Sequence, residues 1–439
     1  LNWRKLEENF GSESGYLGFL RDSPSAAQRL CHVLSNSRFL GDALNKSVES
    51  VTWLGNDDSL QPRSRESLDI QTKATLERNA GNINDFANSI RAMRRHEIER
   101  IGLAWMSGVI DDEASLAGMT DVYDAAIEAS LQWAIQHRIN DIQIDEAPAA
   151  IAIIGMGRYG GREVNFSSDA DVIIIYRPAE GADDDQANLF ARKVQEDLRA
   201  ILQGPTTFEP KIELDMDLRP EGKNGPLVRS YASCEEYYRS WASTWEHQAL
   251  LRARYAAGDA SLAEDFLMNI ADPLRYPKID LTETQIAEIR KLKARMEAER
   301  LPRGVRRDRH LKLGKGGLSD VEWTIQLLQL QHAGDNANLR VNGTLQALNE
   351  LEHRKLISAG DAVVLRKAWR MCTAARNGSY LWSGRVNQAD ILPDDSYSLG
   401  GIAVYLGYDA NRGQHFENDL LAVIRKARDV TERLFYGRS

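Results

Sequence analysis

The stretch Ser167-Ser-Asp-Ala-Asp-Val-Ile-Ile-Ile-Tyr176 decides the fold of this chain. It joins two carboxylates, Asp169 and Asp171, to an apolar, β-branched run that is typical of a buried strand. Side chains alternate between the faces of a strand, so residues two apart point the same way. Two like charges on one face are unfavourable unless a cation lies between them, and Mg²⁺ prefers oxygen ligands. We therefore expect a Mg²⁺ site, of the kind used in nucleotidyl transfer, at the start of this strand.

A glycine-rich turn precedes the carboxylates. A second strand-like run, residues 151–154, leads into Gly155-Met-Gly-Arg-Tyr-Gly-Gly161. Glycines let the backbone approach a phosphate, the amides of a following helix start can bind it, and Arg158 adds a fixed positive charge. The sequence therefore predicts that Gly155, Gly157, Arg158 and Gly160 bind phosphates.

The same glycines spell G-x-G-x-x-G, the fingerprint of dinucleotide-binding proteins. In those proteins the acidic residue follows by about 20 residues and closes the second strand. Here Asp169 and Asp171 come sooner and open the next strand. The spacing favours nucleotidyl transfer over dinucleotide binding. A purely structural role, with the acids capping turns, is the remaining interpretation.

A third carboxylate is expected from a strand at 211–218. Glu213, Asp215 and Asp217 have the same parity and share one face. One of them beside the first pair would complete a two-metal site. A solvated edge strand is the alternative interpretation.

Composition excludes several classes of protein. The chain has 439 residues, which suggests two or three domains, and its 43% hydrophobic and 27% charged residues are ordinary for a globular protein. No apolar run reaches the length of a membrane span, and no signal peptide is expected. A net charge of −9 disfavours broad nucleic-acid binding. Cys31, Cys234 and Cys372 suggest neither a zinc site nor disulfides, which fits a reducing cytoplasm. The start at Leu1 suggests a fragment of a longer protein.

We expect three regions: helical residues 1–118, a mixed region at 119–278 and helical residues 279–439. Helices are predicted at 26–36, 66–80, 84–106, 121–138, about 185–203 and 234–256, and strands at 150–155 and 171–176. A cluster of cations in the third of these helices is expected to form a solvated face; it comprises Arg91, Arg94, Arg95, His96 and Arg100.

The helix predicted at 234–256 carries an apolar stripe, comprising Tyr238, Trp241, Trp245 and Ala249. Glu246, Arg252 and Arg254 lie off this stripe and could face a nucleotide or solvent. Further along, Ser319 and Glu322 form the pattern of a helix capping box. The glycines and Lys315 just before it could bind phosphate or serve the cap alone.

Four stretches closely resemble, in the same order, the motifs of the glutamine synthetase adenylyltransferase family: Gly155–Asp171, Leu214–Val228, Thr244–Arg254 and Lys312–Trp323. The resemblance implies an α+β fold with a DNA polymerase beta-like nucleotidyltransferase domain, a small mixed sheet with flanking helices. This domain would lie between an N-terminal helical region and a C-terminal helical bundle. Members of the family have two homologous halves, of which one attaches AMP to a tyrosine of glutamine synthetase and the other removes it by phosphorolysis.

By motif position, the resemblance implies that Asp169, Asp171 and Asp215 are the catalytic residues and hold two Mg²⁺ ions, with Asp217 in reserve for Asp215. ATP is the implied substrate. Its candidate binding residues are Gly155, Gly157, Arg158, Gly160, Ser168, Arg219, Lys223, Arg252 and Lys315. A single copy of the motifs indicates one half. The Asp-Ala-Asp form, the phrase Leu-Ser-Asp-Val-Glu-Trp and the ending at 431–439 resemble the C-terminal, adenylylating half of an actinobacterial-type enzyme.

The implied partners are glutamine synthetase as protein substrate, and a PII-type signal protein and glutamine as regulators, with no nucleic acid and no membrane. A cytoplasmic location is expected. The alternative enzymatic interpretations are the AMP-removing half and a related uridylyltransferase. A nucleotide-sensing regulatory module is the non-enzymatic alternative, against which the intact aspartate pair argues.

Overall fold

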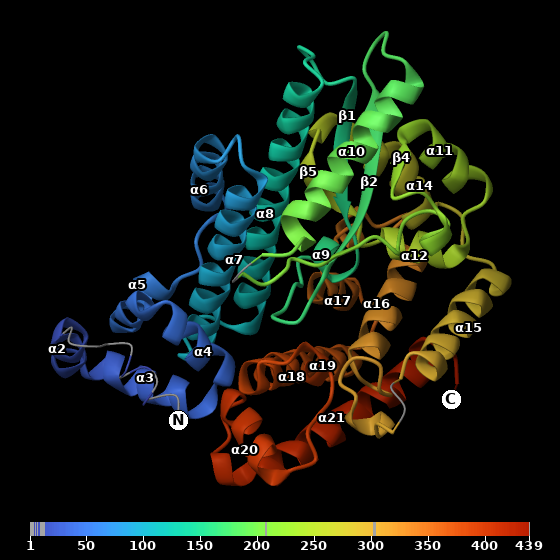
Figure 1. The fold of residues 1–439 in the computed structure, drawn as a ribbon. Helices are drawn as coiled ribbons and strands as arrows, with labels where there is room; N and C mark the ends of the chain where they lie inside the picture. The colour runs from blue at the N-terminus through green and yellow to red at the C-terminus, as the bar shows by residue number, and fades with distance from the viewer. Residues whose placement is uncertain are drawn as a thin grey trace.

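A small mixed sheet lies in the middle of the chain, with helices from all parts of the sequence around it (Figure 1). The computed structural model describes Arg4, Leu6, Glu8 and residues 14–206, 209–301 and 304–438. The described structure is mostly helical, which confirms the expected α+β class. None of the described helices combines the length and the apolar character needed to cross a bilayer.

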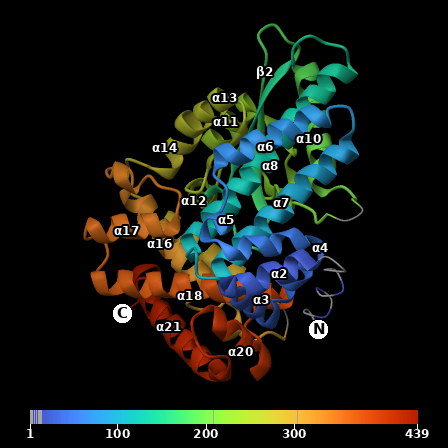
Figure 2. The same ribbon diagram turned by 90° about the vertical axis from the view of Figure 1, so that its left-hand side faces the viewer.

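Helices make up the part of the chain before the sheet. They are α2 (Ser14–Asp22), α3 (Pro24–Asn36), α4 (Arg38–Lys46), η1 (Val48–Gly55), α5 (Asp57–Leu60), α6 (Arg65–Arg78), α7 (Ile83–Met106) and α8 (Asp112–Asp141). The bounds of α3, α6 and α7 agree closely with the predicted helices, whereas α8 begins nine residues before the predicted helix at 121–138. The long helices α7 and α8 pack against each other and bring the N-terminal helices to the sheet (Figure 2). Helix α8 runs through residue 118, where the sequence analysis places a domain boundary. That boundary stays a prediction.

The sheet is built on two long central strands, β1 (Ala149–Gly155) and β2 (Ala170–Pro178), which are antiparallel. Strand β5 (Arg254–Gly258) pairs antiparallel with β1, while β3 (Leu214–Asp215) and β4 (Val228–Ser230) each pair parallel with β2. The short helix α9 (Gly157–Gly160) follows β1. The third predicted strand is much shorter than 211–218, because the Asp217 amide bonds to the Asp215 side chain and the chain turns there.

Helices cover both faces of the sheet. Helices α8 and α10 (Asp184–Gln203) pack on one face, where Val172 and Ile174 of β2 point. The opposite face, toward which Ile173 and Ile175 point, is covered by a second group. These elements are α11 (Tyr231–Ser240), α12 (Thr244–Leu250), α13 (Ala260–Asp265), η3 (Phe266–Ala271) and α14 (Asp272–Arg275). The turn η2 (Gly222–Asn224) precedes β4.

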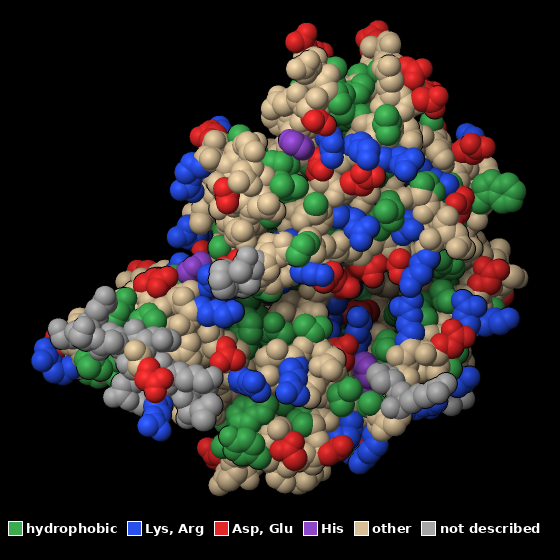
Figure 3. Space-filling view, in the orientation of Figure 1, with side chains coloured by type: hydrophobic (Ala, Val, Ile, Leu, Met, Phe, Trp, Pro, Cys, Tyr) green, Lys and Arg blue, Asp and Glu red, His purple; other side chains and the backbone are tan. Residues whose placement is uncertain are grey.

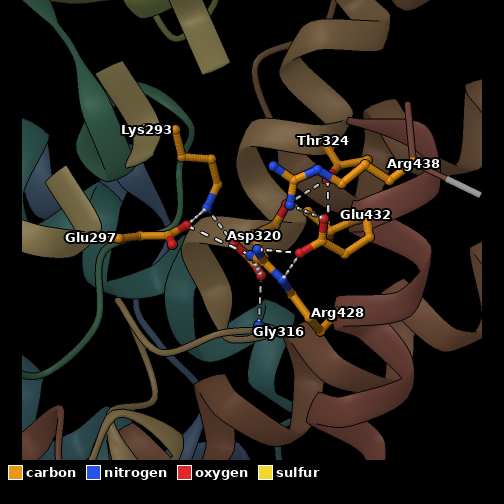
Figure 4. A network of polar contacts seen from close by, with 9 residues as sticks. Lys293, Glu297, Gly316, Asp320, Thr324, Arg428, Glu432 and Arg438 are labelled. Carbon is orange, nitrogen blue, oxygen red and sulfur yellow. Dashed lines mark hydrogen bonds and ion pairs between the residues drawn. The ribbon is translucent and has the colours of Figure 1, made fainter. Parts of the chain in front are cut away.

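The rest of the chain forms a helical layer with its own apolar core around Trp369. Its elements are α15 (Glu283–Glu299), η4 (Arg307–Arg309), α16 (Leu318–His332), η5 (Ala337–Leu339), α17 (Thr344–His353), α18 (Ala359–Ser383), α19 (Val386–Ala389), α20 (Ser396–Tyr405), η6 (Ala410–Arg412) and α21 (Gly413–Leu434). A buried charge network centred on Asp320 joins α15, α16 and α21 (Figure 4).

Two local predictions are wrong. The predicted helix at 234–256 is two helices, α11 and α12, followed by strand β5, and Trp241 at their junction is 75% exposed rather than in the core. The capping box of Ser319 and Glu322 does not form, because α16 starts one residue earlier, at Leu318 after Gly317.

The cationic cluster of α7 is also not a solvated face, since Arg91, Arg94 and Arg100 are buried. Arg91 donates to the carbonyl oxygens of Ile201 and Gly204, both at 2.8 Å, and so satisfies the free carbonyl end of α10.

Candidate active site

Asp171 and Asp215 lie side by side at one edge of the sheet. They are register partners in the parallel pairing of β2 with β3. Asp169 directly precedes β2, and the Ala170 amide after it bonds to the Glu213 carbonyl. Strand alternation turns Asp169 and Asp171 to the face of Ile173 and Ile175. The structure therefore brings together the three carboxylates that the sequence singled out.

These carboxylates are not neutralised by the protein. Among the described residues, no Lys, Arg or His forms an ion pair with Asp169, Asp171 or Asp215. Burial, and after it the negative charges of Asp169 and Asp215, raise the pKa of Asp171 to about 7. The positive charge of Lys312 opposes this rise in the pKa of Asp171. The site thus concentrates negative charge that a bound cation would stabilise.

Asp217 has a different environment from Asp215. Its carboxylate is exposed and lies 3.3 Å from the Lys223 ammonium and 3.8 Å from the Arg219 guanidinium. The Asp215 side chain instead accepts the Asp217 amide at 2.7 Å through Oδ1 and leaves Oδ2 for another partner. This arrangement favours Asp215 over Asp217 as the third carboxylate.

The glycine turn lies directly against the aspartates. Gly157 has φ of +53°, and a Cβ there would overlap the Asp171 carboxylate. A Cβ at Gly160 would overlap the Arg252 carbonyl and that of Gly155, the last residue of β1. The turn therefore needs glycine for close packing of backbone against the acidic site, which is the geometry expected for a phosphate-binding turn.

Several predicted ATP-binding residues are held by other contacts. Arg158 is buried, donates Nε to the Glu163 carbonyl at 3.1 Å, and lies 3.5 Å from Glu322 of α16. Burial lowers the pKa of the Arg158 guanidinium. Arg252 binds the Asn342 carbonyl and the Thr344 hydroxyl, and lies 3.4 Å from Glu163. These two arginines join the sheet region to the C-terminal helices.

Two further candidates organise their own loops. The buried Arg219 donates to the carbonyls of Met216, Lys223 and Gly225. The Ser168 hydroxyl donates to the Asn165 side chain at 2.7 Å within the turn before β2.

The sequence analysis did not decide whether Arg254 and Glu246 face a nucleotide or solvent. Arg254 forms an ion pair with Asp124 at 2.7 Å. Glu246 caps α12 with Ser243. Both have structural contacts that account for them.

Lys312 is the site residue that sequence reasoning missed. It is the cation that acts on Asp171, whereas the predicted Lys315 is exposed. The same Lys312 helps lower the pKa of Asp390, an effect due first to Arg376, which donates to Asp390 at 2.5 Å. In the sequence, Lys312 could have been found as a site candidate because it lies in the same motif as Lys315, three residues earlier.

Asp169 and Asp215 border an open pocket of about 490 Å³. Its charged lining residues are Asp169, Arg199, Glu213, Asp215, Asp217, Arg219 and Lys223. In Figure 3, acidic side chains gather at the rim of a hollow near the centre of the face shown. The pocket gives a charged substrate access to the aspartates from solvent.

Comparison with known proteins finds two matching families. Residues 27–269 match the family described as Glutamate-ammonia ligase adenylyltransferase, and residues 289–435 match the family described as GlnD PII-uridylyltransferase.

Three relatives share the name "Bifunctional glutamine synthetase adenylyltransferase/adenylyl-removing enzyme". The protein from Bifidobacterium longum (strain DJO10A) is 79% identical over 439 residues, covering 100% of this chain and 41% of the relative. That from Leifsonia xyli subsp. xyli (strain CTCB07) is 42% identical, covering 100% of the chain and 42% of the relative. That from Mycobacterium tuberculosis (strain CDC 1551 / Oshkosh) is 41% identical, covering 99% and 43%.

The chain therefore spans about two fifths of the length of these curated relatives. The first family match covers more than half of the chain. The chain belongs to the glutamate-ammonia ligase adenylyltransferase family.

Proposed function

We propose that this chain is the adenylylating half of a two-part enzyme and transfers AMP from ATP to a tyrosine hydroxyl of glutamine synthetase, releasing pyrophosphate. The observation that carries the proposal is the pairing of Asp171 with Asp215, next to Asp169 and against a glycine turn. The names of the relatives support the reaction class. In this proposal residues 119–278 form a DNA polymerase beta-like domain between the helical regions 1–118 and 279–439.

The aspartates fit a pair of Mg²⁺ ions. Among the described residues, no group of three or more His, Cys, Asp and Glu is placed so that these side chains alone could hold a metal ion. Mg²⁺ keeps several waters and is usually held by one or two carboxylates together with substrate phosphates, so an open acidic edge suits it. We assign one ion to Asp169 and Asp171 and a second to a site shared with Asp215. Bound there, the ions would neutralise charge on the phosphates and favour ionisation of the attacking hydroxyl.

The protein's own groups have distinct roles in the proposed reaction. The turn at Gly157 lets the ATP phosphates approach the backbone beside Asp171, and Lys312 balances part of the negative charge. The tyrosine oxygen attacks the α-phosphorus in line. A new oxygen–phosphorus bond forms while the bond to pyrophosphate breaks. The phenolic proton passes to water in the open pocket that Asp215 borders.

The AMP-removing half and a uridylyltransferase are the competing reactions. The relatives' shared name includes adenylyl removal, and residues 289–435 resemble a PII-uridylyltransferase. Regulation by a PII-type protein and glutamine, and a cytoplasmic location, accompany the main proposal without an assigned site.

Product analysis separates the three reactions. The purified chain would be incubated with glutamine synthetase and α-labelled ATP, with pre-adenylylated synthetase and phosphate, and with PII-type protein and α-labelled UTP. We expect label on synthetase in the first reaction. ADP formation in the second alone identifies the removing half, and label in the third alone identifies a uridylyltransferase. Absence of all three products contradicts an enzymatic role for the isolated chain.

A further inference from the structure

A second pocket, here called the aromatic pocket, opens on the other side of Asp169. Its volume is about 700 Å³, and it is lined by residues of α4, α7, α8, the turn before β2 and the end of α18. It shares Asp169 and Glu213 with the open acidic pocket. Its lining includes neither Asp171 nor Lys312 nor any glycine of the turn. Both pockets thus reach the candidate catalytic site at Asp169.

The walls of the aromatic pocket are flat rings. Phe39 and Tyr380 have ring centroids 5.0 Å apart and are both partly exposed. Phe166 lies behind Tyr380, with centroids 6.2 Å apart and planes inclined by 10°. The open acidic pocket has no aromatic lining residue among those described. A ligand with a planar ring would thus find its packing surface in the aromatic pocket alone of the two.

Arg94 places an unneutralised positive charge in the same wall. Its side chain is 9% exposed, and its guanidinium donates to the Tyr123 hydroxyl at 2.8 Å. Its Nε has no hydrogen-bond partner, and no described carboxylate forms an ion pair with it. The next residue, Arg95, pairs with Glu209 at 2.9 Å. A buried cation without a carboxylate partner is unfavourable, so the charge of Arg94 favours an anionic group on the occupant.

We propose that the aromatic pocket binds the acceptor segment of the protein substrate, with the tyrosine ring packed against Phe39 and Tyr380 and a carboxylate of the same segment at Arg94. This inference rests on the proposed function. The acceptor hydroxyl would then reach Asp169, which lines both pockets.

Steady-state kinetics with separate variation of the two substrates tests this inference. The Tyr380→Leu variant is expected to raise the KM for glutamine synthetase about tenfold, as loss of one aromatic packing partner implies, with little change in the KM for ATP. The Tyr380→Phe variant keeps the ring and should bring the KM back toward the wild-type value. Tyr397→Leu, at a tyrosine that is 78% exposed and outside this pocket, is the matched control.

A peptide competition addresses Arg94. A short peptide with tyrosine flanked by glutamates should inhibit labelling of glutamine synthetase at lower concentration than the same peptide flanked by glutamines. The Arg94→Gln variant should remove that difference, with its melting temperature recorded to check folding. An increase in the KM for ATP alone in Tyr380→Leu, or equal inhibition by both peptides in the wild type, overturns the inference. Failure of the wild type to label synthetase instead contradicts the proposed function.

Discussion

At the scale of single residues, the most distinctive feature is a set of charges without partners. Asp169, Asp171 and Asp215 have no ion pair among the described residues, although elsewhere the chain pairs most of its buried charges, such as Asp124 with Arg254. Their types and spacing were predictable from sequence because strand alternation fixes which side chains share a face. The role of Lys312 was not predictable from sequence, because its position relative to Asp171 depends on how the C-terminal helices pack against the sheet.

The choice between the two candidate third carboxylates can be tested directly. Asp215→Asn should lower the rate of AMP transfer at least about a hundredfold, because a ligand to a catalytic ion contributes several kcal/mol to transition-state stabilisation. Asp217→Asn should lower it less than about tenfold, since this carboxylate is paired with Lys223. Initial rates at saturating ATP provide the comparison. The reverse order of the two effects would assign the role to Asp217.

A second matched pair tests the cation at the site. Lys312→Met should reduce kcat/KM for ATP by about tenfold or more, because it removes the positive charge that acts beside Asp171. Lys315→Met, three residues away and exposed, should behave as wild type. Equal losses in both variants would contradict the assignment of Lys312.

Buried Glu99 predicts a pH effect on stability. Its pKa is raised to about 8, chiefly by burial and also by the negative charge of Glu49 of η1, while Ser50, Arg95 and Arg100 oppose the shift. Unfolded glutamate titrates near 4.3, so the folded state binds the proton more tightly between these values and stability falls as pH rises through that window. We expect Glu99→Gln to melt above the wild type at pH 8.5 and close to it at pH 5. A constant difference at both pH values would contradict this account.

At the scale of elements, the helices predicted at 26–36, 66–80, 84–106, 121–138 and about 185–203 are present, as are the two central strands. The failure at 234–256 has a physical cause, since residues 254–258 pair with β1 and this pairing overrides helical spacing. The pattern Ser243-Thr-Trp-Glu246 marked the break, because it forms a real capping box. The similar pattern at Ser319 led to a wrong prediction of a capping box, since Glu322 lies beside Arg158 instead.

The Asp320 network fixes the packing of three C-terminal elements (Figure 4). The buried Asp320 binds Lys293, the Arg428 guanidinium at 2.9 Å and the Gly316 amide at 2.6 Å. Asp320→Ala leaves both cations without this partner, and we expect a loss of about 3–5 kcal/mol in unfolding free energy. Asp308→Ala, which removes an exposed pair with Arg306, should lose less than about 1 kcal/mol. Urea denaturation followed by circular dichroism compares them, and equal losses would contradict a structural role for the network.

At the scale of the whole molecule, the site is assembled from three distant parts of the chain. The sheet supplies the aspartates, α4 and α7 supply Phe39 and Arg94, and α18 supplies Tyr380. Sequence motifs located the first part, but the others carry no motif and became visible only through packing. Contacts such as Arg252 with Thr344 hold the C-terminal helices against the sheet.

The most direct test of the central claim is transfer of label from α-labelled ATP to glutamine synthetase by the wild type and two variants. The account predicts that Asp171→Asn abolishes labelling while its melting temperature stays close to that of wild type, and that Asp184→Asn, on the exposed first turn of α10, labels at the wild-type rate. A folded Asp171→Asn variant that labels synthetase at a rate near wild type would contradict the assignment of the aspartate cluster as the catalytic site.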